Sequence, residues 1–470
     1  MSMMFDSDTV PKTVVVQGLG FVGAAMAVAV ASAADTNSAP CFDVIGIDLD
    51  NPAGNKRVNS INSGIFPFET VDQSMIKGTE NCVKRGNLRA TTDHSVIGKA
   101  DVVVISVNLD ISSIDGTTPN VNFAPFKKAI HTLGKGVRKG TLIIVETTVP
   151  PGTCVSIIRP LLDEHLAKRG IDPGSVLVAH SYERVMPGAE YLDSIVNFWR
   201  VYSGISVQAA NQCEAFLSKI INVKEYPLTR LQTTFASETA KVLENSYRAV
   251  NIAFMEEWGR FAEEVGFDLF EVIDAIRMRP THSNMRQPGF GVGGYCLTKD
   301  PLFAKLAAKE LFHLDGHEFP FSSQAIKING EMPLVTLGKL RKHFGGSISG
   351  KKILLMGISY RQDVGDTRYS PSEKFTAQAL REGAFVSPCD PFVKYWNEMQ
   401  MPVSADLPEP ETFDAIVFAV PHNDYRRIDF NLWLRTRGNY ILFDANNVLT
   451  NNQRSILKDM GNTLLSIGRG

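Results

Sequence analysis

The chain has 470 residues, 44% of them hydrophobic, and its 48 Lys and Arg residues nearly balance its 50 Asp and Glu residues. The length predicts two to four domains, and the net charge of -2 excludes the basic surface that a nucleic-acid partner requires. The N-terminal "MSMMFDSDTV" has no basic segment, and no apolar stretch reaches the roughly 18 residues of a membrane span, so we expect neither a signal peptide nor a membrane anchor.

The first predicted elements are a strand and a helix within residues 12–32, and the turn that joins them is predicted to bind a dinucleotide. The β-branched run "KTVVVQ" is followed by Gly18, Gly20 and Gly23 and then by a helix of small residues. Gly18 permits a tight turn, Gly20 lets the backbone approach a pyrophosphate, and Gly23 lets the helix pack closely against the strand. The first N–H groups of the helix would bind the anion. A glycine turn of another α/β fold is the alternative, but the flanking strand and helix favour the nucleotide site.

A second apolar strand, "FDVIGIDLD", places Asp48 at its end. Its carboxylate is placed to bond both ribose hydroxyls and would repel a 2′-phosphate, which favours NAD over NADP. The 25 residues between Gly23 and Asp48 exceed the usual spacing because the polar segment "DTNSAP" is inserted before Cys41.

Further strands alternate with helices in the first half of the chain, and this alternation predicts a parallel sheet with ligands beyond its carboxyl ends. The predicted strands lie within residues 100–108, 140–153 and 175–190. Thr147, Thr148 and Glu183 follow such strand ends and are therefore candidate functional residues. Each is equally compatible with a turn or a helix cap.

Residues 229–266 predict one unusually long helix, since they contain no proline and their apolar positions recur at helical spacing. A helix of this length bridges domains or subunits. Lys241 and Asn245 stand four residues apart and so share one face. The simpler interpretation is that both side chains face solvent.

Past Pro333 the strand pattern returns, and the chain is predicted to be an α/β protein with two Rossmann-like parallel-sheet domains joined by a central helical domain. "KKILLMGISYRQDVGDTRYSPS" predicts a strand, a polar loop and a helix start, and residues 384–391, 413–422 and 439–448 predict three more strands. Arg361 and Arg368 in the polar loop are candidate diphosphate ligands, although loop arginines are usually solvated. A cleft between the halves would hold a second ligand.

Cys296 lies in the glycine-rich segment "PGFGVGGYCLTKDP", and the six cysteines form neither a CxxC pair nor a zinc-ligand pattern. We therefore expect no disulfide framework and no metal, but reduced thiols in a cytoplasmic protein. A neighbouring cation such as Lys299 or Lys241 would lower the pKa of the Cys296 thiol. In an NAD enzyme, a thiolate adds to an aldehyde, and hydride loss from the adduct gives a thioester that water converts to an acid. A cysteine used only for packing is the alternative.

The chain resembles the UDP-glucose/GDP-mannose dehydrogenase family, whose members are the nucleotide-sugar 6-dehydrogenases. The resemblance rests on eight motifs in order: "GLGFVG", "INSGIFPFE", "ETTVPPGT", "ERVMPG", "AKVLENSYRAVNIAFMEE", "PGFGVGGYCLTKDP", "GISYRQDVGDTRYSP" and "IVFAVPH". It implies that two NAD molecules oxidise one NDP-sugar to an NDP-uronic acid, a precursor of surface polysaccharide. It also implies an NAD domain at 1–205, a central helical dimerisation domain at 206–330 that makes a homodimer, and an NDP-sugar domain at 331–470.

The resemblance assigns catalytic roles by motif. Cys296 would be the nucleophile of the thiohemiacetal and thioester steps, Lys241 would stabilise the developing oxyanion, and Asn245 would orient the substrate oxygen. Asp300, through a bound water, would accept the proton in the alcohol oxidation.

The remaining roles concern water, cofactor and substrate. Glu183 and Thr148 would position or activate the hydrolytic water. The implied cofactor contacts are Gly18, Gly20, Phe21, Val22, Gly23, Asp48, Thr148 and Arg368. The implied substrate contacts are Glu183, Arg184, Lys241, Asn245, Gly293 and Arg361. Arg361 stands where the family usually has a lysine.

Two pairs of residues depart from the family pattern. Leu109 and Asp110 replace a "TP" pair near the cofactor, and Asn446 and Asn447 stand where an arginine is common. "ERVMPG" and "PGFGVGG" resemble the branch acting on UDP-N-acetylhexosamines, whereas "CLTKDP" resembles the UDP-glucose branch. We favour a UDP-N-acetylhexosamine, with UDP-glucose as the alternative.

Two other functions stay open. A single-step β-hydroxyacid dehydrogenase shares the Rossmann half and a catalytic lysine but needs no nucleophilic cysteine and no second α/β domain. A non-catalytic NAD or nucleotide-sugar sensor would keep the fold, yet the presence of Cys296, Lys241, Asn245 and Asp300 argues against it.

Overall fold

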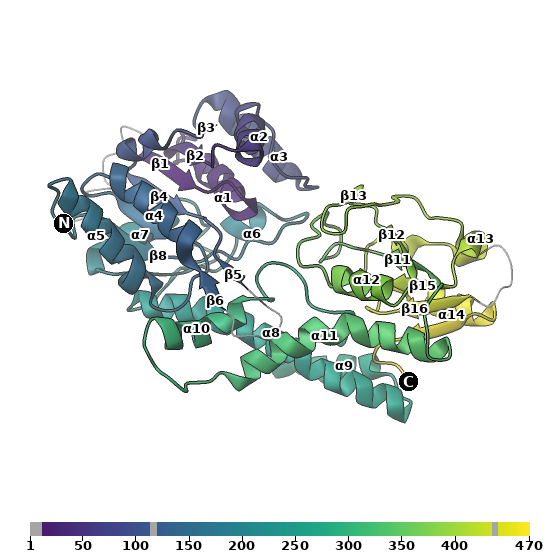
Figure 1. The fold of residues 1–470 in the computed structure, drawn as a ribbon. Helices are drawn as coiled ribbons and strands as arrows, with labels where there is room; N and C mark the ends of the chain where they lie inside the picture. Colours follow the sequence, from purple (N-terminus) through teal and green to yellow (C-terminus); the bar gives the residue numbers. More distant parts are fainter. Residues whose placement is uncertain (1–11, 113–119, 435–439) are drawn as a thin grey trace. The chain divides into compact units, whose positions relative to one another are not determined.

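The computed structural model describes residues 12–112, 120–434 and 440–470. The chain divides into two compact units (Figure 1). Unit 1 comprises Met1–Leu243 and Phe303–Glu318, and unit 2 comprises Glu244–Leu302 and Phe319–Gly470. The expectation about a signal peptide falls on the first ten residues, which lie outside the described ones. In the described part of the chain, no helix is both long and apolar enough to cross a membrane.

Unit 1 is built on an eight-stranded sheet of order β10-β9-β8-β7-β4-β1-β2-β3. Its strands are β1 (Lys12–Gln17), β2 (Phe42–Ile47), β3 (Leu88–Thr91), β4 (Val102–Ile105), β7 (Leu142–Val145), β8 (Leu177–His180), β9 (Val201–Gly204) and β10 (Thr229–Arg230). All neighbours pair in parallel except β8 and β9. After β1 the chain adds β2 and β3 on one side of that strand, and it then crosses back to add β4 on the other side of β1. This reversal is the topological switch point at which α/β sheets bind ligands.

Helices cover the sheet of unit 1, and its apolar runs are buried on both faces, as parallel strands require. They are α1 (Phe21–Ser32), α2 (Pro52–Asn62), α3 (Gln73–Arg85), η1 (His94–Lys99), α4 (Phe123–Gly136), η2 (Cys154–Ile158), α5 (Arg159–Lys168), α6 (Asp193–Val196), α7 (Val207–Leu217) and α10 (Phe303–Glu310). β5 (Asp110–Ser112) pairs antiparallel with β6 (Asn120–Asn122). The side chains of Asn51 and Asp72 cap α2 and α3, which explains where these helices begin.

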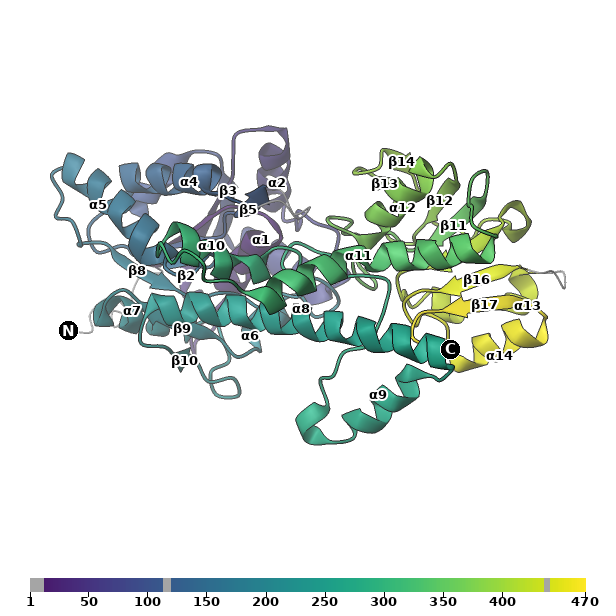
Figure 2. The same ribbon diagram turned by 60° about the horizontal axis from the view of Figure 1, so that its bottom comes forward.

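The predicted long helix is α8 (Thr234–Val265), and the division between the two units falls within it. The expected start at Thr229 was wrong, because Thr229 and Arg230 form β10 against β9. α9 (Leu269–Arg277) packs on the carboxy-terminal half of α8 through Met255, Ala262, Leu269 and Ile273 (Figure 2).

Unit 2 contains a five-stranded parallel sheet of order β12-β11-β15-β16-β17. The strands are β11 (Lys352–Met356), β12 (Phe385–Cys389), β15 (Ala415–Phe418), β16 (Ile441–Asp444) and β17 (Thr463–Ser466), and β13 (Tyr395–Trp396) pairs separately with β14 (Met401–Pro402). The helices are η3 (Pro280–His282), η4 (Asp300–Leu302), α11 (Pro320–His343), α12 (Pro371–Arg381), η5 (Pro410–Thr412), η6 (Tyr425–Arg427), α13 (Phe430–Trp433) and α14 (Asn451–Asp459). Sequence analysis had missed β17.

Successive residues of β11 enter two different cores, because side chains alternate across a strand. Ile353 and Leu355 pack with Leu337 of α11 and Phe375 of α12. Leu354 and Met356 pack on the other face with residues of α13 and α14, including Phe430 and Leu457. The sheet is therefore covered on both faces, and the predicted α/β class with two Rossmann-like sheets and a helical middle is confirmed.

A buried ion pair stabilises the carboxyl ends of the strands in unit 1. Glu146, directly after β7, binds the guanidinium of Arg200, and both side chains are almost fully buried. Ser106 donates to the Glu146 carboxylate at 2.9 Å, and Arg200 Nε donates to Ser181 Oγ at 3.3 Å. Burial raises the pKa of Glu146 while Arg200 opposes that shift. Removing one partner would leave an uncompensated buried charge.

Arg200→Leu is therefore expected to lower the free energy of unfolding by roughly 3–5 kcal/mol, as measured by urea denaturation. Arg89→Leu is the matched control, because Arg89 pairs with Asp43 on the surface and such pairs contribute about 1 kcal/mol or less. Equal small losses in the two variants would contradict a structural role for the buried pair.

Candidate functional site

The glycine turn after β1 has no room for side chains at two of its three glycines. Gly18 has φ 94°, and a Cβ there would lie 2.7 Å from the Ser106 carbonyl oxygen. A Cβ at Gly23 would lie 1.8 Å from the Gly18 carbonyl oxygen. Gly20 faces open space and no side chain caps α1, so the first turn of α1, with Phe21 and Val22, is accessible to an anion. This cradle fits the pyrophosphate of NAD.

Asp48 is held in place at the end of β2. Its Oδ1 accepts a hydrogen bond from Leu49 N at 2.8 Å, and its Oδ2 accepts one from Arg57 Nε of α2 at 2.6 Å. The carboxylate is buried, with 6% of its surface exposed. Sequence analysis missed Arg57, because nothing in its spacing shows that α2 turns this side chain back toward β2.

Two threonines follow β7: Thr147 has a structural role, and Thr148 is the candidate catalytic residue. Thr147 Oγ1 donates to the Val107 carbonyl oxygen at 2.8 Å, which supports its reading as a turn residue. Thr148 precedes the turn Pro150–Cys154. The departures Leu109 and Asp110 follow Val107 in the chain; Leu109 is buried and Asp110 begins β5.

Lys241 and Glu183 come together in unit 1, although 58 residues separate them. The Lys241 ammonium donates to the Glu183 carbonyl oxygen at 2.8 Å and lies 5.3 Å from the centre of the Tyr182 ring. Only 6% of Lys241 is exposed, so the interpretation of a solvent-facing lysine was wrong. The Glu183 carboxylate accepts from Val185 N, and Arg184 stacks on the Tyr182 ring at 5.5 Å.

A buried polar cluster adjoins Cys296 in unit 2. Asn245 Nδ2 donates to Asp300 Oδ2 at 2.7 Å, and Lys299 Nζ pairs with Asp300 Oδ1 at 2.8 Å. Asn245, Lys299 and Asp300 are each at most 3% exposed. The Lys299 ammonium also lies 4.2 Å from the centre of the Tyr295 ring. Asn245 is thus no surface residue, and both carboxylate oxygens of Asp300 are engaged.

Cys296 is half-buried and begins the turn that ends at Asp300. Its carbonyl oxygen accepts from Lys299 N at 3.2 Å and from Asp300 N at 2.9 Å. The preceding glycines allow close packing, since a Cβ at Gly293 or Gly294 would lie 2.8 Å from Tyr360. Burial raises the pKa of the Tyr360 hydroxyl to about 12, and Asp366 and Cys296 act in the same direction. The glycine run therefore brings the cysteine loop against the loop between β11 and α12.

A cavity of about 300 Å³ lies at the carboxyl ends of β11, β15 and β16. Its lining includes Gly291, Arg361, Ser372 at the start of α12, Pro421 and Asn446. Asn446 Nδ2 donates to the Ala419 carbonyl oxygen at 2.9 Å, so this departure from the family pattern faces the cavity as a fixed amide. Asn447, the next residue that departs from the family pattern, accepts a hydrogen bond through its Oδ1 from Arg469 Nη1 at 2.9 Å.

Of the two candidate arginines, Arg361 lines this cavity, whereas Arg368 forms an ion pair with Asp366. Their loop is anchored by Asp363, which has φ 54° and donates its N–H to His422 Nδ1 at 2.9 Å. The ring proton of a neutral His422 is therefore on Nε2, which lies 3.2 Å from the Asp390 carboxylate. Sequence analysis did not identify this anchor, because Asp363, Asp390 and His422 belong to three separate loops.

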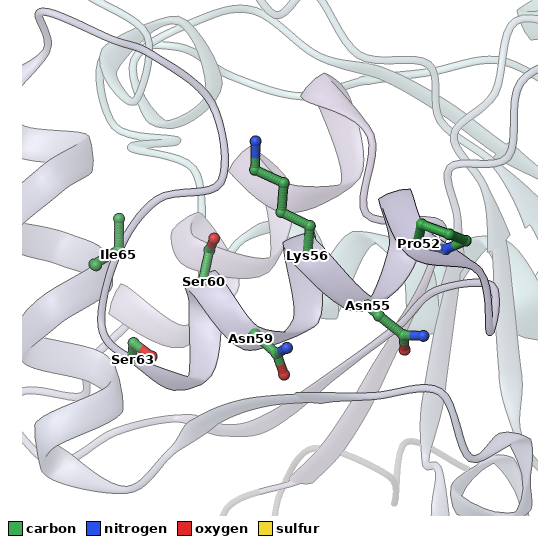
Figure 3. Close-up of a pocket in the computed structure, with 7 residues that line it drawn as sticks. All are labelled: Pro52, Asn55, Lys56, Asn59, Ser60, Ser63 and Ile65. Atoms are coloured by element: carbon green, nitrogen blue, oxygen red, sulfur yellow. The ribbon is translucent and has the colours of Figure 1, made fainter.

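A second, shallow hollow of about 510 Å³ runs along α2 (Figure 3). Lys56 and Ser60 point to one side of the helix and Asn55 and Asn59 to the other. No predicted site residue lines it. Over residues 12–112, 120–434 and 440–470, no three His, Cys, Asp or Glu side chains are grouped in a way that could hold a metal ion.

Three family models match the chain in order. The NAD binding domain of the UDP-glucose/GDP-mannose dehydrogenase family matches residues 12–220, the central domain matches 236–331, and the UDP binding domain matches 354–451. A UDP-N-acetyl-D-mannosamine dehydrogenase of Methanocaldococcus jannaschii is 30% identical over 94% of each chain. A counterpart of the same name from Pyrococcus horikoshii is 28% identical over 93% of this chain and 96% of its own.

Solved structures agree with these sequence matches. A UDP-D-ManNAc dehydrogenase from Pyrococcus horikoshii superposes with a TM-score of 0.81 at 25% identity, over 97% of this chain and 99% of the other. An NDP-N-acetyl-D-galactosaminuronic acid dehydrogenase from Methanosarcina mazei superposes with a TM-score of 0.78 at 25% identity, over 98% and 95%.

Asp48→Ala is expected to weaken NAD binding about tenfold or more, because the ribose hydroxyls lose a charged acceptor. Binding of a nucleotide sugar should stay within about twofold of the wild-type value, and calorimetric titration with each ligand measures both. Asp43→Ala on the same strand is the control, since Asp43 pairs with Arg89 at the surface. A larger effect on the sugar nucleotide than on NAD would refute the cofactor assignment.

Proposed function

The chain belongs to the UDP-glucose/GDP-mannose dehydrogenase family, and from this premise we propose that it oxidises C6 of a UDP-N-acetylhexosamine to the uronic acid in a four-electron, NAD-dependent reaction. The observation that carries the proposal is the hydrogen bond from Asn245 to Asp300. It joins the long helix to the turn that begins at Cys296, so that an amide and a carboxylate meet beside the backbone of the cysteine.

We assign the tasks to three regions of the chain. Residues 1–205 bind NAD through the glycine turn and Asp48, residues 206–330 contribute the catalytic helix and the cysteine loop, and residues 331–470 bind the nucleotide of the sugar. Bound NAD accepts a hydride at each of the two oxidation steps. Thr148 and Arg368 are further candidate cofactor contacts.

In the first oxidation, the C6 carbon of the sugar would give up a hydride to bound NAD, and the C6 hydroxyl would lose its proton to a water held by Asp300. Lys299 and Asn245 occupy both oxygens of Asp300 and so fix its orientation. Lys241 stabilises the oxyanion that develops as the proton leaves, because its buried ammonium is a strong donor. The product is an aldehyde.

In the second oxidation, the Cys296 thiolate adds to the aldehyde carbon, and the resulting thiohemiacetal loses a hydride to a second NAD, which gives a thioester. Glu183 and Thr148 position a water that attacks this thioester. The C–S bond breaks, Cys296 regains its thiol and the uronic acid leaves. Two hydrides and one water account for the change from alcohol to carboxylate.

The nucleotide end of the substrate would occupy the 300 Å³ cavity of unit 2. Arg361 supplies a guanidinium for the diphosphate. Gly293 and Arg184 are further candidate substrate contacts.

The relatives named UDP-N-acetyl-D-mannosamine dehydrogenase support the N-acetylhexosamine. UDP-glucose is the second candidate, because Lys299 in "CLTKDP" matches that branch. A panel of UDP-glucose and the UDP-N-acetyl derivatives of glucosamine, galactosamine and mannosamine, followed by NADH absorbance, separates the two. A kcat/KM for UDP-glucose above that of every N-acetylated sugar would overturn the choice.

The wild-type enzyme is expected to form two NADH per nucleotide sugar. Cys296→Ala should bind NAD normally but lose uronate production by at least a thousandfold, because no thioester can form. Cys41→Ala is the control, since Cys41 is also half-buried but lies before β2. One NADH per sugar in the wild-type enzyme would instead favour a single-step β-hydroxyacid dehydrogenase.

We further propose that the enzyme is a homodimer through α8 and acts in the cytoplasm, where Cys296 stays reduced. One stripe of α8 in unit 2 carries Tyr247, Phe254, Trp258, Phe261 and Val265, each about half exposed. Their spacing of three, four or seven residues places them on one face. The Phe254, Trp258 and Phe261 rings contact one another in edge-on pairs, and such an exposed aromatic row is typical of an interface.

Trp258→Glu is expected to convert the dimer to a monomer at micromolar concentration, because a charge in the middle of the aromatic row raises the Kd at least about thirtyfold. Light scattering coupled to gel filtration measures the mass. Leu432→Glu is the control, since Leu432 is exposed on α13, away from the stripe. A wild-type monomer, or a Trp258→Glu dimer, would refute the interface.

A further inference from the structure

The first two turns of α8 are fastened to the carboxyl ends of the unit 1 strands by buried polar side chains. Ser237 Oγ lies 2.7 Å from His180 Nδ1 at the end of β8 and 2.7 Å from Ser203 Oγ of β9. Burial lowers the pKa of His180 to about 3, with Arg200 and Lys241 adding to the shift, so the ring is neutral. One turn further along, Lys241 binds the Glu183 carbonyl oxygen.

Glu238 makes the third connection and has no role in the mechanism above. It is fully buried, and its carboxylate accepts Gly152 N at 2.6 Å and Cys154 N at 2.8 Å. Both N–H groups belong to the turn that follows Thr148. Glu238 and Lys241 are three residues apart on α8 and are therefore neighbours on its surface.

The turn that Glu238 holds is closely packed on its other side. Gly152 has φ 96°, and a Cβ there would lie 2.8 Å from the Phe312 ring and 3.1 Å from the Phe235 ring. The two rings are tilted at 43° to each other, with their centroids 5.7 Å apart. The turn is thus confined between an aromatic pair and a carboxylate.

We propose that Glu238 is a positioning residue whose carboxylate fixes the turn that follows Thr148 relative to the helix that carries Lys241. The inference rests on the proposed function of those two residues. An ionised carboxylate accepts both N–H groups, whereas a protonated one has an oxygen that must donate. The hydrogen-bond partners of the Glu238 carboxylate are donors, namely the N–H groups of Gly152 and Cys154 and the Cys154 thiol, which is the titratable group of the turn.

Protonation therefore loosens the turn, and it occurs near neutral pH. Burial raises the pKa of Glu238 to about 7, although the hydrogen bonds from Cys154 and Gly152 oppose the shift. The ionised form prevails above that pH and the protonated form below it. Catalysis depends on sub-ångström placement, and a displacement of about 1 Å lowers rates by up to a hundredfold.

The test is Glu238→Gln, which keeps the size of the side chain but places an NH2 group against one of the two N–H donors. We expect kcat to fall tenfold or more, with the KM values for NAD and nucleotide sugar within twofold of wild type. The wild-type kcat should fall as the pH drops through about 7, and the variant should lose this limb. Glu225→Gln, an exposed glutamate of unit 1, should leave both the rate and the pH profile unchanged.

Hydrogen exchange of the peptide covering residues 147–154 provides a readout that needs no turnover. Protection relative to the unfolded peptide should fall in Glu238→Gln and in wild type below pH 7. Unchanged protection, or a variant with the wild-type kcat and pH profile, overturns the proposal. If the variant does not fold, the pH dependence of wild-type protection decides. Absence of turnover with every nucleotide sugar would refute the proposed function alone, because the exchange measurement still reports on the turn.

Discussion

The hydrogen bond between Asn245 and Asp300 is the constraint on which the candidate site of unit 2 depends. The Cys296 loop is rich in glycine and would have many conformations by itself, since glycine loses more backbone entropy on ordering than other residues. Asp300 closes this loop, because one oxygen binds the helix residue Asn245 and the other binds Lys299. Asn245 on α8 thereby fixes the position of the glycine-rich Cys296 loop.

Burial strengthens the hydrogen bonds of these polar groups and also makes the loss of a partner more destabilising. Asn245, Lys299 and Asp300 are almost fully buried, and a buried charge is tolerated only when partners satisfy it. In a medium of lower dielectric than water, each hydrogen bond is stronger, and loss of one partner is correspondingly more damaging. The same reasoning applies to Glu146 and Arg200 in unit 1. Unit 1 thus combines an apolar sheet core with a buried ion pair at the carboxyl ends of its strands, and unit 2 combines one with a buried polar cluster beside the cysteine loop.

Helix α8 unites three kinds of interaction along its length. Its first turns carry Ser237, Glu238 and Lys241, which bind the strand ends of unit 1. Asn245 follows one turn later and binds the cysteine loop of unit 2. Beyond it comes the exposed aromatic stripe. Side chains three and four residues apart share a face, which explains how the members of each set lie together on the helix surface.

The sequence by itself determined the fold class, the family and the identity of the chemical groups. The glycine turn with Asp48, the long helix and the Cys296 segment were all visible, because periodicity and glycine spacing are local properties of the chain. Tertiary structure alone decided which groups meet. Contacts between distant segments bring Arg57 to Asp48, Glu238 to the turn after Thr148, and His422 to the Arg361 loop. The expected start of the long helix instead forms β10, because it pairs with β9. Such contacts depend on long-range packing, which no local pattern encodes.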